Sequence, residues 1–204
     1  SVLVQQYFWW ASLTNRFSSG VETKIEQDLH RMDDILDGKE PTYRGEEVKL
    51  TLEELKFRWF SAGDAFCKAI LCLYAYHQPK RFNNNDLVKI DNSWLKMVNS
   101  KNYHHFFPNA YLKNKGYAYW QSNSILNITI VDDFLNKRKI KARAPKDYLE
   151  EFKHKNKHFL ETMNSHLICN PDDYGIWEDD YEKFLEERGK VVLSEIESRL
   201  NPEL

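Results

Sequence analysis

Two adjacent histidines, His104 and His105, precede the segment Phe106-Phe107-Pro108 near the middle of this 204-residue sequence. An imidazole can act as a general base near neutral pH, because its unperturbed pKa is about 6.5 and a hydrogen bond to one ring nitrogen leaves the other to take a proton. Neutral imidazole and asparagine oxygen also suit a divalent ion that retains several waters. Successive side chains of a strand point to opposite faces, so we expect the two histidines to have different roles unless the chain bends between them.

Two asparagines and a basic run follow the histidines in an order that suits phosphodiester hydrolysis. Asn127 lies between Leu126 and Ile128, and Asn136 immediately precedes the basic run. The reaction needs a base for the attacking water, a Lewis acid for the scissile phosphate and positive groups that place the nucleic-acid backbone. The basic residues expected to contact phosphates are Lys137, Arg138, Lys139, Lys141 and Arg143.

The net charge of −2 hides an uneven distribution along the chain. Residues 99–157 contain 12 basic and 5 acidic side chains, whereas residues 158–204 contain 4 basic and 12 acidic ones. Residues 1–98 are nearly balanced, with 13 basic and 14 acidic side chains. A polyanionic partner is therefore expected to bind the middle third of the chain.

The motif around His105 resembles that of the HNH, or His-Me finger, nucleases, in which a β-hairpin is followed by a helix. The segments at residues 7–19, 102–108 and 123–128 resemble the C-terminal region of GmrSD-type restriction proteins, and this resemblance covers essentially the whole chain. It implies a metal-dependent HNH endonuclease that hydrolyses DNA in restriction or phage defence. It also implies that an NTP-utilising, ParB-like domain precedes this region in the complete protein.

The resemblance assigns a role to each candidate residue. It implies that His105 is the general base and that Asn127 braces the loop that orients His105. His104 and Asn136 would be the metal ligands, with His104 standing where many relatives have aspartate. The metal is expected to be Mg²⁺, although an imidazole ligand favours softer ions, so Mn²⁺ or another transition metal stays open.

The elements that must position these residues divide the chain into three predicted parts. Residues 1–98 are expected to be a helical scaffold, residues 99–157 an HNH-like ββα-metal module, and residues 158–204 an acidic helical segment that packs on the same unit. The expected fold class is α+β and predominantly helical. With no long apolar run and no signal peptide, the chain is expected to be a cytoplasmic fragment of a longer protein without membrane contact, and its oligomeric state is open.

Local patterns predict the individual elements. Apolar residues from Val21 to Leu36 predict a helix that ends at Gly38. A capping box at Thr51 and Glu54 predicts the start of one long core helix that stops before Pro79. A further helix is expected over residues 87–98, a strand over residues 125–131, a helix over residues 136–141 and another with Pro145 at its first position. The last helix is expected to end near Leu200.

Three other interpretations remain open at this stage. The histidines could form a structural pair against an aromatic wall, the asparagines could be turn or cap residues, and the basic run could be a solvated helix face. For Asn123 the turn interpretation is the favoured one. As a whole the chain could be a non-catalytic nucleic-acid-binding or assembly module, or a nuclease directed at RNA.

The cysteines argue against two kinds of site. There are three, Cys67, Cys72 and Cys169, and they form no CxxC pair. This number and spacing favour neither a disulfide framework nor a structural zinc cluster.

Overall fold

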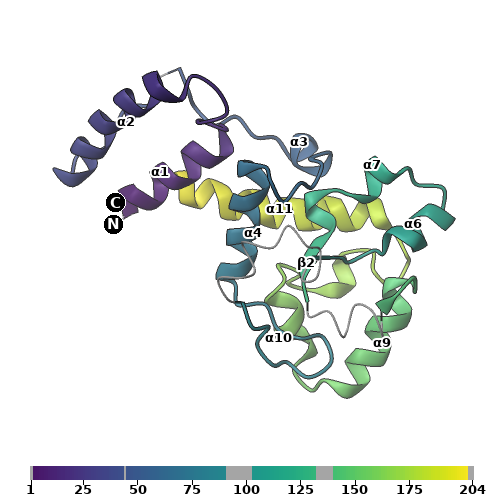
Figure 1. Cartoon of the computed structure of the whole chain (residues 1–204). Helices are drawn as coiled ribbons and strands as arrows, with labels where there is room; N and C mark the ends of the chain where they lie inside the picture. The colour runs from purple at the N-terminus through teal and green to yellow at the C-terminus, as the bar shows by residue number, and fades with distance from the viewer. Residues whose placement is uncertain (1, 44, 91–102, 132–139, 202–204) are drawn as a thin grey trace.

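The computed structural model describes residues 2–43, 45–90, 103–131 and 140–201, which form a predominantly helical protein with one small antiparallel sheet (Figure 1). The predicted helical character and the presence of a small sheet are thus confirmed. The described elements are α1 (Val2–Leu13), α2 (Val21–Leu36), α3 (Leu52–Lys56), α4 (Ala65–Tyr76), β1 (Tyr103–His105), α6 (Asn109–Asn114), α7 (Tyr119–Ser122), η1 (Ile125–Asn127), β2 (Ile128–Ile130), α9 (Pro145–Lys155), α10 (Phe159–Asn164), η3 (Pro171–Asp173) and α11 (Tyr181–Leu200).

Several helix boundaries follow from local sequence, as predicted. The helix expected from Val21 is α2, which ends at Leu36 just before Gly38. The capping box is present, because the Thr51 hydroxyl accepts from the Glu54 amide while the Glu54 carboxylate accepts from the Thr51 amide. Pro145 is the first residue of α9, where its missing N–H group costs no intrahelical hydrogen bond.

The prediction of one continuous helix from Thr51 to Pro79 was wrong. The chain leaves the helix after Lys56 and begins α4 only at Ala65. Between them, the Arg58 carbonyl accepts from the Ile125 amide at 2.9 Å, and the Phe60 amide donates to the Asn123 carbonyl at 2.8 Å. This pairing with a distant segment outweighs the local helical pattern, and α4 then starts afresh with the Asp64 side chain as its N-cap.

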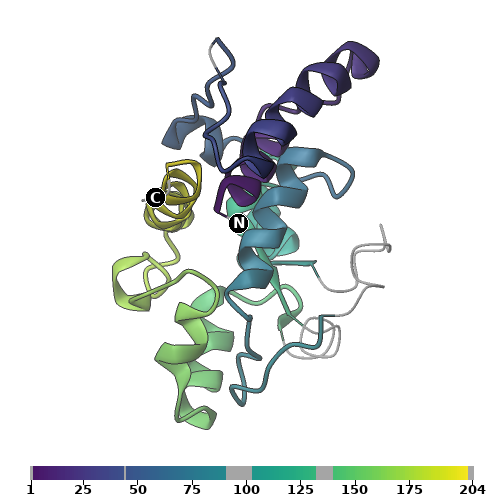
Figure 2. The ribbon, with the colours of Figure 1, turned by 90° about the vertical axis from the view of Figure 1, so that its left-hand side faces the viewer.

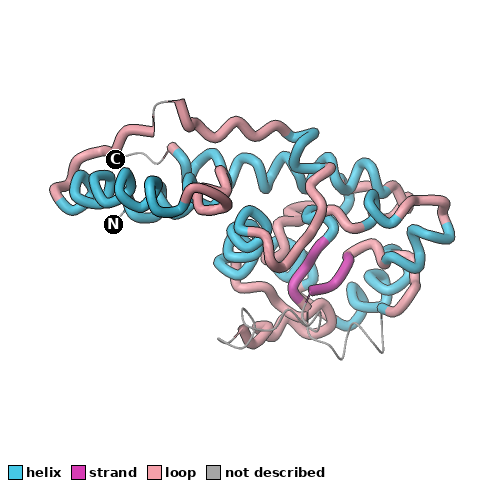
Figure 3. The backbone as a smooth tube through the Cα atoms, turned by 45° about the horizontal axis from the view of Figure 1, so that its top comes forward, coloured by secondary structure: helices cyan, strands magenta, loops and turns pink. Residues whose placement is uncertain are grey.

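The sheet pairs β1 with β2 antiparallel, with His104 opposite Thr129 and His105 opposite Ile128 (Figure 3). The predicted strand over residues 125–131 is therefore shorter than expected, because its first three residues form the 3₁₀ helix η1. The helix predicted over residues 87–98 is absent from residues 87–90, where Leu87 forms a β-bridge with Lys80. Residues 91–98, and most of the helix predicted at 136–141, lie outside the described residues.

The long helix α11 extends from α3 to α1, so that the two ends of the described chain lie close together (Figures 1 and 2). It contacts α1, α3 and η1. At Gly189 these neighbours come so close that an added Cβ atom would lie 2.5 Å from Leu52 Cδ1 and 3.0 Å from Leu126 Cδ1. The hydrophobic core draws buried residues from all three predicted parts, while the proposed boundaries between these parts stay a prediction.

Candidate functional site

His105 lies at the end of β1, where its ring is held by two asparagines. Its Nε2 atom is 2.9 Å from Oδ1 of Asn123 and 3.3 Å from Nδ2 of Asn109, the first residue of α6. The Asn123 Nδ2 group donates to the Phe60 carbonyl at 3.0 Å, so the amide presents its oxygen to the histidine. The break between α3 and α4 thus has a local consequence, because it places Phe60 where its carbonyl can orient Asn123.

This arrangement defines the tautomer of His105. Since Asn123 Oδ1 can only accept, the hydrogen bond requires a proton on Nε2 of His105. In the neutral ring Nδ1 then carries the lone pair and is the atom that can take a proton. A protonated Nε2 has no lone pair for the Asn109 amide, so the Asn109 contact restricts the ring by packing.

Burial lowers the pKa of His105 from its usual value of 6.5, and the hydrogen bond to Asn123 partly opposes this shift. Burial acts in this direction because transfer out of water disfavours the charged imidazolium. The ring is therefore neutral at pH 7, which is the form that a general base requires.

Asn127 fixes the main chain next to His105. Its fully buried side chain accepts from the Phe107 amide at 2.8 Å and donates to the Phe107 carbonyl at 2.9 Å. The same Nδ2 group donates to the Ser122 carbonyl at 2.8 Å. These bonds tie the segment that follows His105 to the segment that carries Asn123. The geometry accords with the bracing role implied by the resemblance, although the role in catalysis stays a prediction.

Arg188, on α11, supports the turn that contains Asn127. Its Nη1 atom donates to the carbonyls of Leu126 and Ile128 at 2.6 and 2.7 Å, and its Nε atom donates to the His166 carbonyl at 3.2 Å. The guanidinium lies 4.6 Å from the ring centroid of Tyr74, and the residue is 1% exposed. A helix at the end of the chain therefore holds the main chain on both sides of Asn127.

The described residues include one of the two expected metal ligands. His104 is buried on β1, and its carbonyl accepts from the Thr129 hydroxyl at 3.1 Å. Asn136 lies outside the described residues. Within the described ranges, no three or more His, Cys, Asp or Glu side chains are grouped as metal ligands. The donor set described here does not by itself make up a metal site, so the metal remains part of the proposal.

The expected phosphate contacts can be placed only in part. Lys137, Arg138 and Lys139 lie outside the described residues, while Lys141 is exposed. Arg143 pairs with Glu151 of α9 at 2.9 Å and donates to the Asp147 carbonyl at 2.8 Å. A phosphate that binds Arg143 would thus compete with a carboxylate.

The comparisons with known proteins identify a distant relative. The chain is 24% identical, over 221 aligned positions, to a protein of the archaeon Methanocaldococcus jannaschii described as "Uncharacterized protein MJ0686". The alignment covers 95% of this chain but 36% of the relative, so the chain spans about a third of the relative's length. No family model matches the chain, and no solved structure matches it.

Three residues of this site were missed by the sequence-based predictions. Asn123 was expected to be a turn residue, and Asn109 and Arg188 were not considered. For Arg188 a signal was present, because it follows Phe184 and precedes Val192 and Ile196 at intervals of four on the buried face of a helix. An arginine in such a row needs carbonyl or carboxylate partners, so it points to a specific internal contact.

Proposed function

We propose that this chain is the HNH-type nuclease portion of a GmrSD-like restriction or defence protein and that it hydrolyses DNA phosphodiester bonds. The observation that carries the proposal is the 2.9 Å contact between His105 Nε2 and Asn123 Oδ1, which assigns the proton to Nε2 and leaves Nδ1 as the basic atom of the neutral ring. Support also comes from its place at the end of β1, with β2 antiparallel beside it and Asn127 immediately before β2, at the end of η1.

In the proposed reaction, His105 Nδ1 takes a proton from the attacking water. Asn123 keeps the ring in the reactive tautomer, and Asn127 holds the main chain that carries it. A divalent ion, Mg²⁺ or Mn²⁺ at His104 and Asn136, would supply charge stabilisation at the phosphate and the leaving oxygen. Lys137, Arg138, Lys139, Lys141 and Arg143 are proposed to place the DNA backbone.

The longer relative leaves room for the other proposed parts of the protein. About two thirds of that relative lies outside the alignment, which covers 36% of it. We place an NTP-utilising, ParB-like domain in the corresponding part of the complete protein, which we propose to be cytoplasmic. In the described part of this chain, none of the helices has the length and apolar character needed to cross a bilayer.

Cleavage of supercoiled plasmid tests the proposed activity. With Mg²⁺ or Mn²⁺, His105→Ala is expected to reduce the cleavage rate by about 100-fold or more, because a positioned general base contributes about 10²–10⁴-fold. DNA binding, measured by gel shift with Ca²⁺, should persist. The matched control is His154→Ala, which removes an exposed histidine of α9.

Two outcomes would contradict the proposal. If the parent protein binds DNA but does not cut it with either metal, the chain is a binding module. If His105→Ala cuts as fast as the parent, the base has been assigned to the wrong residue. Matched single-stranded RNA and DNA substrates complete the test, since preferential cleavage of RNA would reject the DNA assignment.

The pH dependence of cleavage should respond to Asn123. In the parent, kcat/KM should rise through a pKa below the usual histidine value of 6.5, because burial lowers the pKa of His105. Asn123→Asp places a carboxylate against Nε2, which favours the imidazolium. The pKa through which kcat/KM rises should therefore increase by about one unit or more. The readout is kcat/KM between pH 5 and 9, with Asn164→Asp as control. If kcat/KM of Asn123→Asp rises through the same pKa as that of the parent, Asn123 does not act on the base.

A further inference from the structure

Helix α2 carries a row of apolar side chains, all of them exposed except half-buried Met32. Val21, Ile25, Leu29, Met32 and Leu36 follow one another at intervals of three or four residues, which places them on one side of the helix. In a helix that packs on a core, such a row is buried. Here Leu29 is 60% exposed and Leu36 is 83% exposed, and the buried residues of α2 are Asp28 and Ile35. We call these five residues the apolar row.

Polar contacts beside the apolar row hold α2 on the protein. The buried Asp28 carboxylate accepts from the Tyr7 hydroxyl at 2.9 Å and from Arg16 Nη2 at 3.1 Å, and it also pairs with Arg31. Glu46 binds both arginines from the loop that precedes α3. These polar contacts hold this edge of α2 on the protein, while the residues of the apolar row other than half-buried Met32 are exposed.

A groove of about 690 Å³ is lined by α1, the segment 15–18 and the start of α4, and it meets the apolar row at Met32. Met32 lines it from the α2 side. From α1 come Val4 and Phe8, which are 48% and 42% exposed, and Phe17 follows at 45%. Met32 is thus the point at which the groove joins the exposed apolar residues of α1 to the apolar row. An apolar surface of this kind marks a binding site more often than chance exposure does.

The length of the surface favours a helix over a small molecule. From Val21 to Leu36 the apolar row extends about 22 Å, at 1.5 Å per residue. This length matches about four turns of a second helix, whose apolar side chains at similar intervals could enter the groove. A compact ligand at Met32 would leave the Val21 end of the apolar row exposed.

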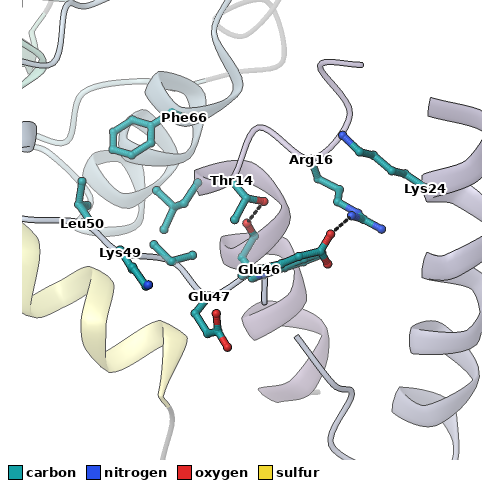
Figure 4. A pocket seen from close by; sticks show the side chains of 11 residues that line it. Thr14, Arg16, Lys24, Glu46, Glu47, Lys49, Leu50 and Phe66 are labelled. Atoms are coloured by element: carbon teal, nitrogen blue, oxygen red, sulfur yellow. Dashed lines mark hydrogen bonds and ion pairs between the residues drawn. The ribbon is translucent and has the colours of Figure 1, made fainter. Parts of the chain in front are cut away.

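Charge indicates the chemistry of the occupant. The outer edge of the apolar row carries the exposed acidic residues Glu22, Glu26 and Asp33, whereas α1 has no charged side chain on the opposite side of the groove. The basic residue Lys24 lies on the other side of α2, where it lines a separate cavity with Arg16 and Glu46 (Figure 4). The groove lining also includes Asp64, whose side chain is partly exposed, and Arg16, which is buried, so the exposed charge around the groove is acidic.

A second copy of the chain fits this rim poorly. In a symmetric antiparallel pairing of two α2 helices, the acidic edge of one copy would face the acidic edge of the other, which is repulsive. A parallel pairing would place the acidic edge against uncharged α1. A helix with basic residues along its flank would be attracted instead.

We propose that the groove between α1 and α2 binds an amphipathic helix of a partner protein that carries Lys and Arg beside its apolar face. The apolar side chains of the partner helix would pack against the apolar row and the exposed face of α1. Glu22, Glu26 and Asp33 would attract its Lys and Arg side chains. This surface is separate from the His105 site, and the inference does not depend on the nuclease activity.

Fluorescence anisotropy with designed peptides tests the inference on the full chain. The probe is a labelled helical peptide of about five turns, with leucine on one face and lysine on the other. Leu29→Asn should weaken its binding by about tenfold, through the loss of one buried leucine contact. Leu160→Asn is the matched control, because Leu160 on α10 is 61% exposed and distant in the fold, and it should leave binding unchanged.

Charge reversal distinguishes recognition from general adhesion. The double variant Glu26→Lys and Asp33→Lys should lose affinity for the lysine peptide and gain affinity for the same peptide with glutamate in place of lysine. The inference is overturned if neither peptide binds, if Leu160→Asn weakens binding as much as Leu29→Asn does, or if the chain forms a dimer in solution that Leu29→Asn dissociates. The last result would assign the groove to a second copy.

Discussion

Arg188→Ala is expected to lower the free energy of unfolding by about 4 kcal/mol. The substitution removes the donor that three main-chain carbonyls share, those of Leu126, Ile128 and His166. Each buried acceptor left without a donor costs about 1–3 kcal/mol, and the space vacated by a large buried side chain adds to this. The loss of an unfavourably buried charge offsets part of the total.

Urea denaturation followed by tryptophan fluorescence measures this effect. Lys190→Ala is the control on the same helix, because Lys190 forms surface pairs with Glu186 and Glu187, and such pairs contribute less than about 1 kcal/mol. Arg188→Lys should fall between the two, since one ammonium group cannot reach all three carbonyls. Equal stability of Arg188→Ala and Lys190→Ala would show that the internal contact is not important for the fold.

Acidification is expected to destabilise the protein by about 3 kcal/mol through His166 alone. Burial lowers the pKa of this histidine from 6.5 to about 4, while its hydrogen bond to the Lys80 carbonyl opposes the shift. Between pH 6.5 and about 4, His166 is therefore protonated in the unfolded chain but neutral in the folded protein. The contribution of His166 is fully present above pH 6.5 and is lost as the pH falls toward 4.

The variant His166→Gln isolates this effect, because glutamine retains an N–H donor for the Lys80 carbonyl but does not titrate. Unfolding free energies at pH 7 and pH 4.5 should differ less in His166→Gln than in the parent protein. His105, whose pKa is also lowered by burial, and the buried carboxylate of Asp28, whose pKa is lowered by its arginine partners, still contribute to acid sensitivity in both proteins. An unchanged pH dependence in His166→Gln would contradict the assignment.

The parts of the fold that could be predicted from sequence are those fixed by neighbouring residues. The helix from Val21, the capping box at Thr51 and the proline at the start of α9 all depend on contacts within a few positions. The break after Lys56 depends instead on hydrogen bonds between Arg58 and Ile125 and between Phe60 and Asn123. No local pattern indicates such a pairing, and the apolar stretch after Thr51 was therefore predicted as one helix.

The candidate site divides in the same way. His105 and Asn127 were selected because their types and order matched a known chemistry, and the structure places both at the junction of β1 and β2. Asn123 was set aside because asparagine is common in turns, and its contact with His105 requires the Phe60 carbonyl from another part of the chain. Asn136 and the run that follows it lie outside the described residues, so their assignment stays a prediction.

The contact between Arg188 and the Asn127 turn limits how this protein can be divided. A fragment made of residues 99–157 would contain His105 and Asn127 but would lack the guanidinium that binds the carbonyls of Leu126 and Ile128. It would also lack the Phe60 carbonyl that orients Asn123. The segment that holds His105 and Asn127 therefore cannot be transferred alone, and a shortened version for engineering or fusion must retain both the residues before α4 and α11.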